Sequence, residues 1–448
     1  MRLDYATSSH LMLLDQHEQP DMTIWANATS DETHWIGVYA GDHAPQWARA
    51  ETFPTDDLQT IARGLQRALS AAQLSSKDPP RYRFATDLPP DGPQQLTRLA
   101  VAGWKAYTAL FNRPQEASPA AAIREGLLAI ALCRPERTNI PWAALYDYHL
   151  DGEKHELCTV FRNERVLDGP AACRARVDCP LRDPQRASRT VCPFGFWGIR
   201  HRIEQPLSHI AGDEALSDEA PYDELQRAAR LGQTIARGDD EPSIVIAAFP
   251  EFKKPAQGHF QEVAALSSRS RCESDRDVVL QLLADAGNHF YYFFCHGVGE
   301  RMDFKLRVEG DIGVADLNHT RFTWRAPAPA PLVFLNGCDT TAFRSDRINK
   351  LLERLRAMGA SGVIGTEIPV HTSLAAEVGR RLLRALIDGK RIGDAFREMR
   401  RELLCEQLNP LGLAYTPFAS ARLHLCSLGA CAACTGTPIA TTSSTRRK

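Results

Sequence analysis

The chain has 448 residues, of which 44% are hydrophobic and 24% charged, and its formal net charge is -2 at pH 7. This composition is typical of a globular protein that is long enough for two or three domains. The near-neutral charge leaves no bulk basic field to attract nucleic acid or an anionic membrane, and no stretch is long enough to span a bilayer. We therefore expect a cytoplasmic protein with mostly reduced cysteines and without nucleic-acid or membrane partners.

The N-terminal part, residues 1–235, mixes strand-like and helical patterns and is assigned to one α/β region. Residues 168–192 are rich in Arg, Asp, Pro and Cys and lack sustained periodicity, so we expect a long surface loop that carries cysteines. The predicted strands and helices of this part cover 21–27, 34–39, 56–71 and 94–111.

From residue 236 to residue 428, short apolar runs alternate with amphipathic segments. Predicted strands cover 243–249, 290–295, 331–335, 362–364 and 421–425, and predicted helices cover 258–267, 274–286, 348–358, 372–388 and 391–407. A hairpin is expected over 304–315. This alternation predicts an α/β fold with a doubly wound, mostly parallel sheet. The small, polar residues 429–448 predict a disordered tail.

Two of the predicted buried strands run into reactive residues. The first continues into Cys295, His296 and Gly297, and the second into Gly337 and Cys338. Active sites of parallel sheets lie beyond the carboxyl ends of the strands, so neighbouring strands would bring the imidazole of His296 and the thiol of Cys338 into one crevice. A thiolate is a nucleophile, and a nearby imidazole can share its proton and protonate a leaving amine. The backbone N–H groups of Gly297 and Cys338 could form an oxyanion hole.

The two strand ends read Tyr-Phe-Phe-Cys-His-Gly and Phe-Leu-Asn-Gly-Cys. Together with four further stretches they resemble, in the same order, the CHAT family of caspase-like peptidases, and the resemblance covers about 96–425. The six stretches lie at 140–147, 191–198, 292–297, 334–338, 359–367 and 409–415. Many relatives have a Trp-Pro-Val-Asp-like stretch where this chain has Ile368-Pro369-Val370-His371, so this rim of the site departs from the family pattern.

The resemblance implies a caspase-like fold in which 236–428 is the active peptidase domain and 1–235 a degenerate half of the same architecture. It implies a catalytic dyad of His296 and Cys338, with the oxyanion role on Gly297 and the Cys338 amide. The implied activity is that of a cysteine endopeptidase that needs no metal or organic cofactor. CHAT relatives often act in bacterial immunity, including antiviral defence, or in programmed death. A protein substrate and an activating partner or ligand are therefore expected.

Three acidic residues are candidates for substrate binding. Several caspase-like relatives bind Arg or Lys at P1 through carboxylates, so the resemblance makes Asp339 and Asp303 candidates for an acidic pocket, although Asp339 more readily serves as a cap for the turn after the nucleophile. Glu367 follows another strand and could line the same crevice, although a solvated rim position is the simpler interpretation. Cys295 is expected to point to the opposite sheet face and to belong to the core.

Other functions are compatible with parts of the sequence. Cys158, Cys173, Cys179 and Cys192 could supply four thiolates to zinc, but their spacing lacks the usual Cys-x-x-Cys pair, so no metal site is assigned. A catalytically silent caspase-like module that only binds a partner is the main alternative to a peptidase. A thiol transferase is a second alternative.

Overall fold

The computed structural model describes most of the chain. The described residues are 21–30, 33–40, 47–73, 92–111, 129–133, 140–205, 241–252, 257–285, 287–298, 305–317, 324, 330–337 and 345–425. Among these residues, no helix is both long enough and apolar enough to cross a membrane.

A six-stranded, largely parallel sheet lies in the C-terminal half. Its strands are β8 (Ile244–Ala248), β9 (Ser270–Glu273), β10 (Phe290–Phe294), β14 (Leu332–Leu335), β15 (Gly362–Thr366) and β16 (Tyr415–Phe418). The order across the sheet is β16-β15-β14-β10-β8-β9, and only the pairing of β15 with β16 is antiparallel. Every strand except β9 is buried along its whole length, which explains the unbroken apolar runs. The predicted α/β fold with a mostly parallel sheet is confirmed.

Helices cover both faces of this sheet. They are α9 (Gln257–Ala264), α10 (Arg276–Ala284), α11 (Ser345–Met358), α12 (Thr372–Ile387) and α13 (Ile392–Gln407). Tyr292 of β10 hydrogen-bonds His259 of α9, whereas Tyr291 donates to the carbonyl groups of Leu282 and Asp285, in and just after α10. Adjacent strand residues point to opposite faces, so α9 and α10 lie on opposite sides of the sheet.

The predicted hairpin is present and extends into a small sheet. β12 (Lys305–Val308) and β13 (Gly310–Gly313) pair antiparallel, and Gly310 has a φ of 105°, which glycine adopts without strain. β11 (His296–Val298) pairs with β12, so the chain enters a three-stranded sheet directly after β10.

The prediction of a last strand over 421–425 was wrong. Among the described residues the last strand is β16, and 421–425 form no strand. The side chain of Asn409 caps the 3-10 turn η7 (Pro410–Ala414) by accepting from the Leu411 N–H, at 3.0 Å. This turn directs 415–418, rather than the later apolar residues, along the edge of the sheet.

A second sheet lies in the N-terminal half. Its strands are β1 (Met22–Ser30), β2 (Thr33–Ala40), β3 (Trp47–Pro54), β4 (Ala129–Cys133) and β7 (Arg202–Glu204). The order is β3-β2-β1-β4-β7; β1 to β3 are antiparallel, whereas β4 pairs parallel with both β1 and β7. The predicted strands and helices of this part are confirmed, the helices being α1 (Thr55–Gln73) and α2 (Gly92–Phe111).

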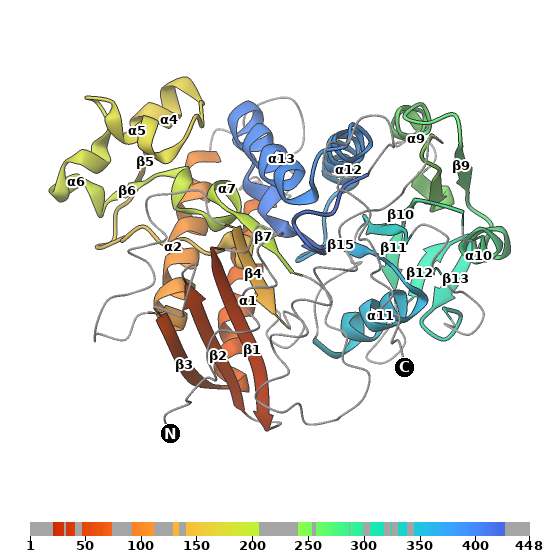
Figure 1. Ribbon diagram of the computed structural model, residues 1–448. Helices are drawn as coiled ribbons and strands as arrows, with labels where there is room; N and C mark the ends of the chain where they lie inside the picture. The colour runs from red at the N-terminus through yellow and green to blue at the C-terminus, as the bar shows by residue number, and fades with distance from the viewer. Residues whose placement is uncertain are drawn as a thin grey trace, which may run out of the picture.

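Short elements occupy the segment between β4 and β7. They are η3 (Trp142–Ala144), β5 (Glu156–Leu157), α4 (Thr159–Glu164), α5 (Pro170–Ala175), η4 (Pro180–Arg182), α6 (Pro184–Ala187), β6 (Thr190–Val191), η5 (Pro193–Gly195) and α7 (Trp197–Arg200), and one further 3-10 turn, η6 (Pro250–Phe252), follows β8. The expected loop at 168–192 therefore contains two short α-helices, a 3-10 turn and a strand. They escape sequence analysis because elements of two to six residues are too short to show periodicity. Figure 1 shows α4, α5 and α6 at the far side of the N-terminal half from the C-terminal sheet.

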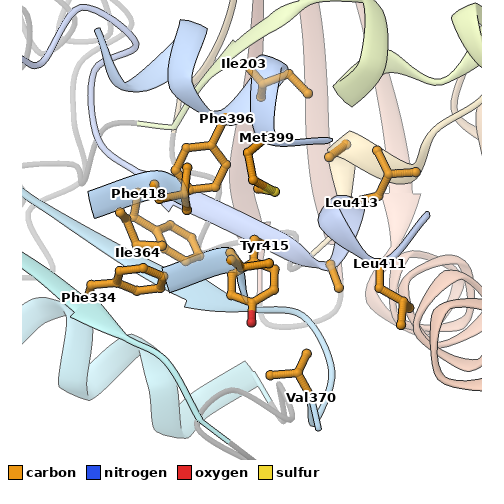
Figure 2. Packing of buried hydrophobic residues seen from close by; sticks show 14 of the residues in the cluster. Ile203, Phe334, Ile364, Val370, Phe396, Met399, Leu411, Leu413, Tyr415 and Phe418 are labelled. Carbon is orange, nitrogen blue, oxygen red and sulfur yellow. The ribbon is translucent and has the colours of Figure 1, made fainter. Parts of the chain in front are cut away.

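The two halves are joined where β7, the edge strand of the N-terminal sheet, lies beside α13 (Figure 1). The backbone N–H of Gln205 donates to the Ala419 carbonyl at 3.2 Å, and the Glu204 carboxylate accepts from Ser420 and from the Ala421 N–H, both at 3.0 Å. Figure 2 shows that the apolar core continues across this junction, with Ile203 beside the side chains of α13. The expected domain boundary at 235 and the tail from 429 lie outside the described residues, so the domain division stays a prediction.

Candidate active site

The two strands that carry the reactive residues are neighbours. β10 and β14 pair parallel, with Phe293 level with Leu335, and the Asn336 N–H donates to the Phe293 carbonyl at 2.8 Å. Two positions further along, just past the strand ends, Cys295 and Gly337 touch through their backbones. A Cβ on Gly337 would lie 1.7 Å from the Cys295 carbonyl oxygen, so only glycine fits. The ends of β10 and β14 therefore lie side by side at the carboxyl edge of the sheet.

The structure describes the segment that follows β10 but not the one that follows Gly337. The backbone of His296 and Gly297 belongs to β11, where they pair with Arg307 and Leu306 of β12. Cys338, Asp339 and Asp303 lie outside the described residues, so the predicted dyad and the acidic pocket stay predictions.

Cys295 behaves as the sequence predicts for a core residue. Its side chain is fully buried, and burial raises the pKa of its thiol well above the ordinary value. A thiol that stays protonated at neutral pH is a poor nucleophile. Cys295 is therefore a packing residue, although it precedes His296.

A buried polar network surrounds the end of β14. The Nδ2 atom of Asn336 donates to the Tyr292 hydroxyl at 2.8 Å and to the Ala375 carbonyl at 2.7 Å. Its Oδ1 atom accepts from the Tyr415 hydroxyl at 3.0 Å. In Figure 2, the Tyr415 hydroxyl points away from Phe396 and Met399 of α13.

Glu367, a predicted substrate ligand, is only 4% exposed. Its carboxyl group accepts a hydrogen bond from Thr416, and its N–H donates to the Ala414 carbonyl at 2.6 Å. Burial raises the pKa of Glu367 to about 7, although the Thr416 hydrogen bond and the nearby Arg400 charge act in the opposite direction. The carboxyl group is thus engaged inside the protein, and the expected solvated rim position is wrong. Contact with substrate remains an untested prediction.

The family of the chain follows from sequence comparison. The family model of the CHAT domain matches residues 100–410. The chain belongs to the CHAT-domain family. The resemblance inferred from the six ordered motifs is confirmed.

A protein named as a probable protease, from Vitiosangium sp. (strain GDMCC 1.1324), is similar in sequence to this chain. It is 30% identical to this CHAT-domain chain over 466 aligned positions, which cover 95% of the chain and 57% of the relative. The chain therefore spans little more than half the length of this relative.

Two crystal structures of the Saccharomyces cerevisiae separase–securin complex are also similar to the CHAT-domain chain. The first has a TM-score of 0.40 at 11% identity and covers 90% of this chain and 30% of that chain. The second has a TM-score of 0.37 at 12% identity and covers 92% and 31%.

The four cysteines considered for zinc lie in the segment between β4 and β7 of the CHAT-domain chain. The thiols of Cys158, Cys173 and Cys192 lie close together, and their mutual interaction lowers the pKa of Cys158 and raises that of Cys192. Cys179 is buried nearby. Within the part of the chain that the structure describes, which includes all four cysteines, no group of three or more His, Cys, Asp or Glu residues is arranged to hold a metal ion.

Sequence analysis missed a contact between the N-terminal half and the stretch that departs from the family pattern. The Gln73 side chain, at the end of α1, donates to the Pro369 carbonyl and accepts from the His371 N–H, both at 2.9 Å. Gln73 itself is buried. A single amide thus holds the segment after β15 by two backbone groups, which no local pattern could reveal because 296 residues separate Gln73 from Pro369.

Sequence analysis included Asn336 only as part of the Phe-Leu-Asn-Gly-Cys motif and assigned it no role of its own. Its signal was present in the sequence, because an asparagine directly after four apolar residues must find hydrogen-bond partners if it is buried. Its partners, from three different elements, could not be inferred.

Proposed function

We propose that this CHAT-domain chain is a cysteine endopeptidase in which Cys338 is the nucleophile and His296 moves the proton. The observation that carries the proposal is the parallel pairing of β10 with β14 and the backbone contact of Cys295 with Gly337. The register, continued by one residue, would bring His296 level with Cys338. Parallel strands that end together present their next side chains at the same edge of the sheet.

The proposed reaction has two steps. The Cys338 sulfur attacks the carbonyl carbon of the scissile bond as its proton passes to His296, and His296 protonates the departing amine, leaving a thioester. Water, deprotonated by His296, then attacks the thioester carbonyl and releases the acid and the thiol. The N–H groups of Gly297 and Cys338 stabilise the oxyanion in both steps. This two-step reaction needs no metal or organic cofactor.

The biological setting is part of the same proposal. The substrate is a protein, in line with the name of the Vitiosangium relative, which is a probable protease. We place the enzyme in the cytoplasm as an effector of bacterial antiviral defence or programmed death that is controlled by an activating partner or ligand. Asp303 and Asp339 are the proposed ligands of a basic P1 side chain.

Cleavage of a peptide library with a varied P1 residue tests the activity. We expect Cys338→Ala and His296→Ala each to lower cleavage at least about 1000-fold, because nucleophile and base act as a unit. Cys272→Ala, at an exposed position of β9, is the matched control and should cleave like the wild type. Wild-type cleavage by Cys338→Ala would refute the proposal.

Two other outcomes identify the alternatives. Partner binding without cleavage by the wild-type protein would favour a silent interaction module. A substrate fragment whose mass includes an added amine or thiol would favour a transferase, since a peptidase leaves free ends.

A further inference from the structure

Asn336 lies directly after β14, between the strand and Gly337, and its side chain is 0% exposed. Both amide protons are used, in the bonds to Tyr292 and Ala375, and the amide oxygen accepts from Tyr415. The backbone N–H adds the bond to Phe293. Four contacts from β10, α12 and β16 thus fix the orientation of this one residue.

The partners of Asn336 are themselves held. The Tyr292 hydroxyl also bonds Nε2 of His259 in α9, at 2.8 Å. Burial lowers the pKa of His259 to about 4, so the imidazole is neutral at neutral pH and its Nε2 atom can accept a hydrogen bond from the tyrosine hydroxyl. A Cβ on Gly379 of α12 would lie 2.2 Å from the Tyr292 hydroxyl and 2.9 Å from Nδ2 of Asn336. The helix backbone therefore packs directly onto the network and leaves no room for it to shift.

Stability alone does not account for such a network. A buried polar network contributes little more than apolar residues of the same shape, and it is costly when any member is unpaired. The network instead fixes a single orientation of Asn336. This residue directly precedes Gly337, whose backbone contacts Cys295 where β14 ends.

We propose that Asn336 is a positioning residue that, with Tyr292 and Tyr415, orients the end of β14 so that the following Cys338 meets His296. This inference rests on the proposed function. It assigns to Asn336 an effect on the rate of the chemical step and not on substrate affinity.

The chain contains a matched control at the opposite end of β10. Asn288 is also buried, and its amide bonds a tyrosine, Tyr291, at 3.3 Å and the carbonyl groups of Leu282 and Asp285, both at 3.2 Å. It precedes the strand instead of following one, so it lies away from the carboxyl edge of the sheet. Asn288→Leu should therefore lower the stability of the protein as Asn336→Leu does, but without displacing the end of β14.

The experiment compares Asn336→Leu with Asn288→Leu on a peptide that the wild type cleaves, and measures kcat, KM, urea unfolding and the rate of Cys338 alkylation by iodoacetamide against pH. A nucleophile displaced by about 1 Å can lose on the order of 100-fold in rate. We expect Asn336→Leu to lower kcat by about 10- to 100-fold, to change KM by less than about twofold and to slow alkylation at neutral pH. Asn288→Leu should keep kcat within about twofold.

Two single-atom deletions cover the case in which Asn336→Leu does not fold. Tyr415→Phe and Tyr292→Phe each remove one hydroxyl group from the network, and each should lower kcat by a smaller factor than Asn336→Leu, with KM unchanged. Normal kcat in both variants would overturn the inference.

Equal losses of kcat in Asn336→Leu and Asn288→Leu would overturn it as well, since Asn336 would then act only on stability. The two proposals fail separately. Cleavage that survives Cys338→Ala defeats the proposed function, whereas loss of cleavage in Cys338→Ala together with normal kcat in Asn336→Leu defeats only the positioning role.

Discussion

Gly337→Ala should separate the two strand ends on which the proposed site depends. The new Cβ would lie 1.7 Å from the Cys295 carbonyl oxygen, whereas real Cβ contacts are essentially never under 3.0 Å. The obstacle is backbone and not the tip of a flexible side chain, so β10 and β14 must move apart at this end by more than about 1 Å.

The magnitude follows from this displacement. Overpacking in a tight interior typically costs about 1–3 kcal/mol, and we expect the upper part of this range because a strand must move. The same displacement should lower kcat about 100-fold, since a misplacement of about 1 Å can have that effect on catalysis.

The assay combines urea unfolding, which gives the free energy of unfolding, with kcat on a cleaved peptide. Gly258→Ala, in α9, is the control because a Cβ there meets no atom within 4 Å. That variant should be as stable as the wild type or slightly more stable, since alanine favours a helix by about 1 kcal/mol over glycine. Wild-type stability and kcat in Gly337→Ala would refute the close backbone contact and the argument built on it.

Two further predictions concern residues around the same edge of the sheet. Burial raises the pKa of Glu367 from 4.5 to about 7 in the folded protein. The folded state therefore binds this proton more tightly than the unfolded state. The free energy of unfolding consequently falls as the pH rises from 4.5 through about 7. Glu367→Gln should therefore raise the free energy of unfolding at pH 8 by about 2–3 kcal/mol and change it little at pH 4; urea unfolding at the two pH values checks this, and an equal effect at both would contradict it. Gln73→Ala should lower the free energy of unfolding by about 1–3 kcal/mol because the Pro369 carbonyl and the His371 N–H lose their shared partner, whereas Gln59→Ala, at an exposed position of the same helix, should have no measurable effect.

Much of the fold was predictable because its signals are local. The all-apolar strands β10 and β14 and the helices between the strands follow from runs and periodicities of a few residues. The position of His296 and Cys338 just after two such strands was equally visible. Local signals failed where elements were short, as in α5 and α6, and where a cap redirected the chain, as Asn409 does before β16.

The sequence by itself determined the kind of sheet, the reactive residue types at two strand ends and the family, because hydrophobic pattern and ordered motifs are properties of neighbouring residues. Only the tertiary structure decided that β10 lies beside β14, that Asn336 is held by Tyr292, Ala375 and Tyr415, and that Gln73 reaches the segment after β15. These contacts join residues tens to hundreds of positions apart. They are set by how the layers pack, to which local preference contributes nothing.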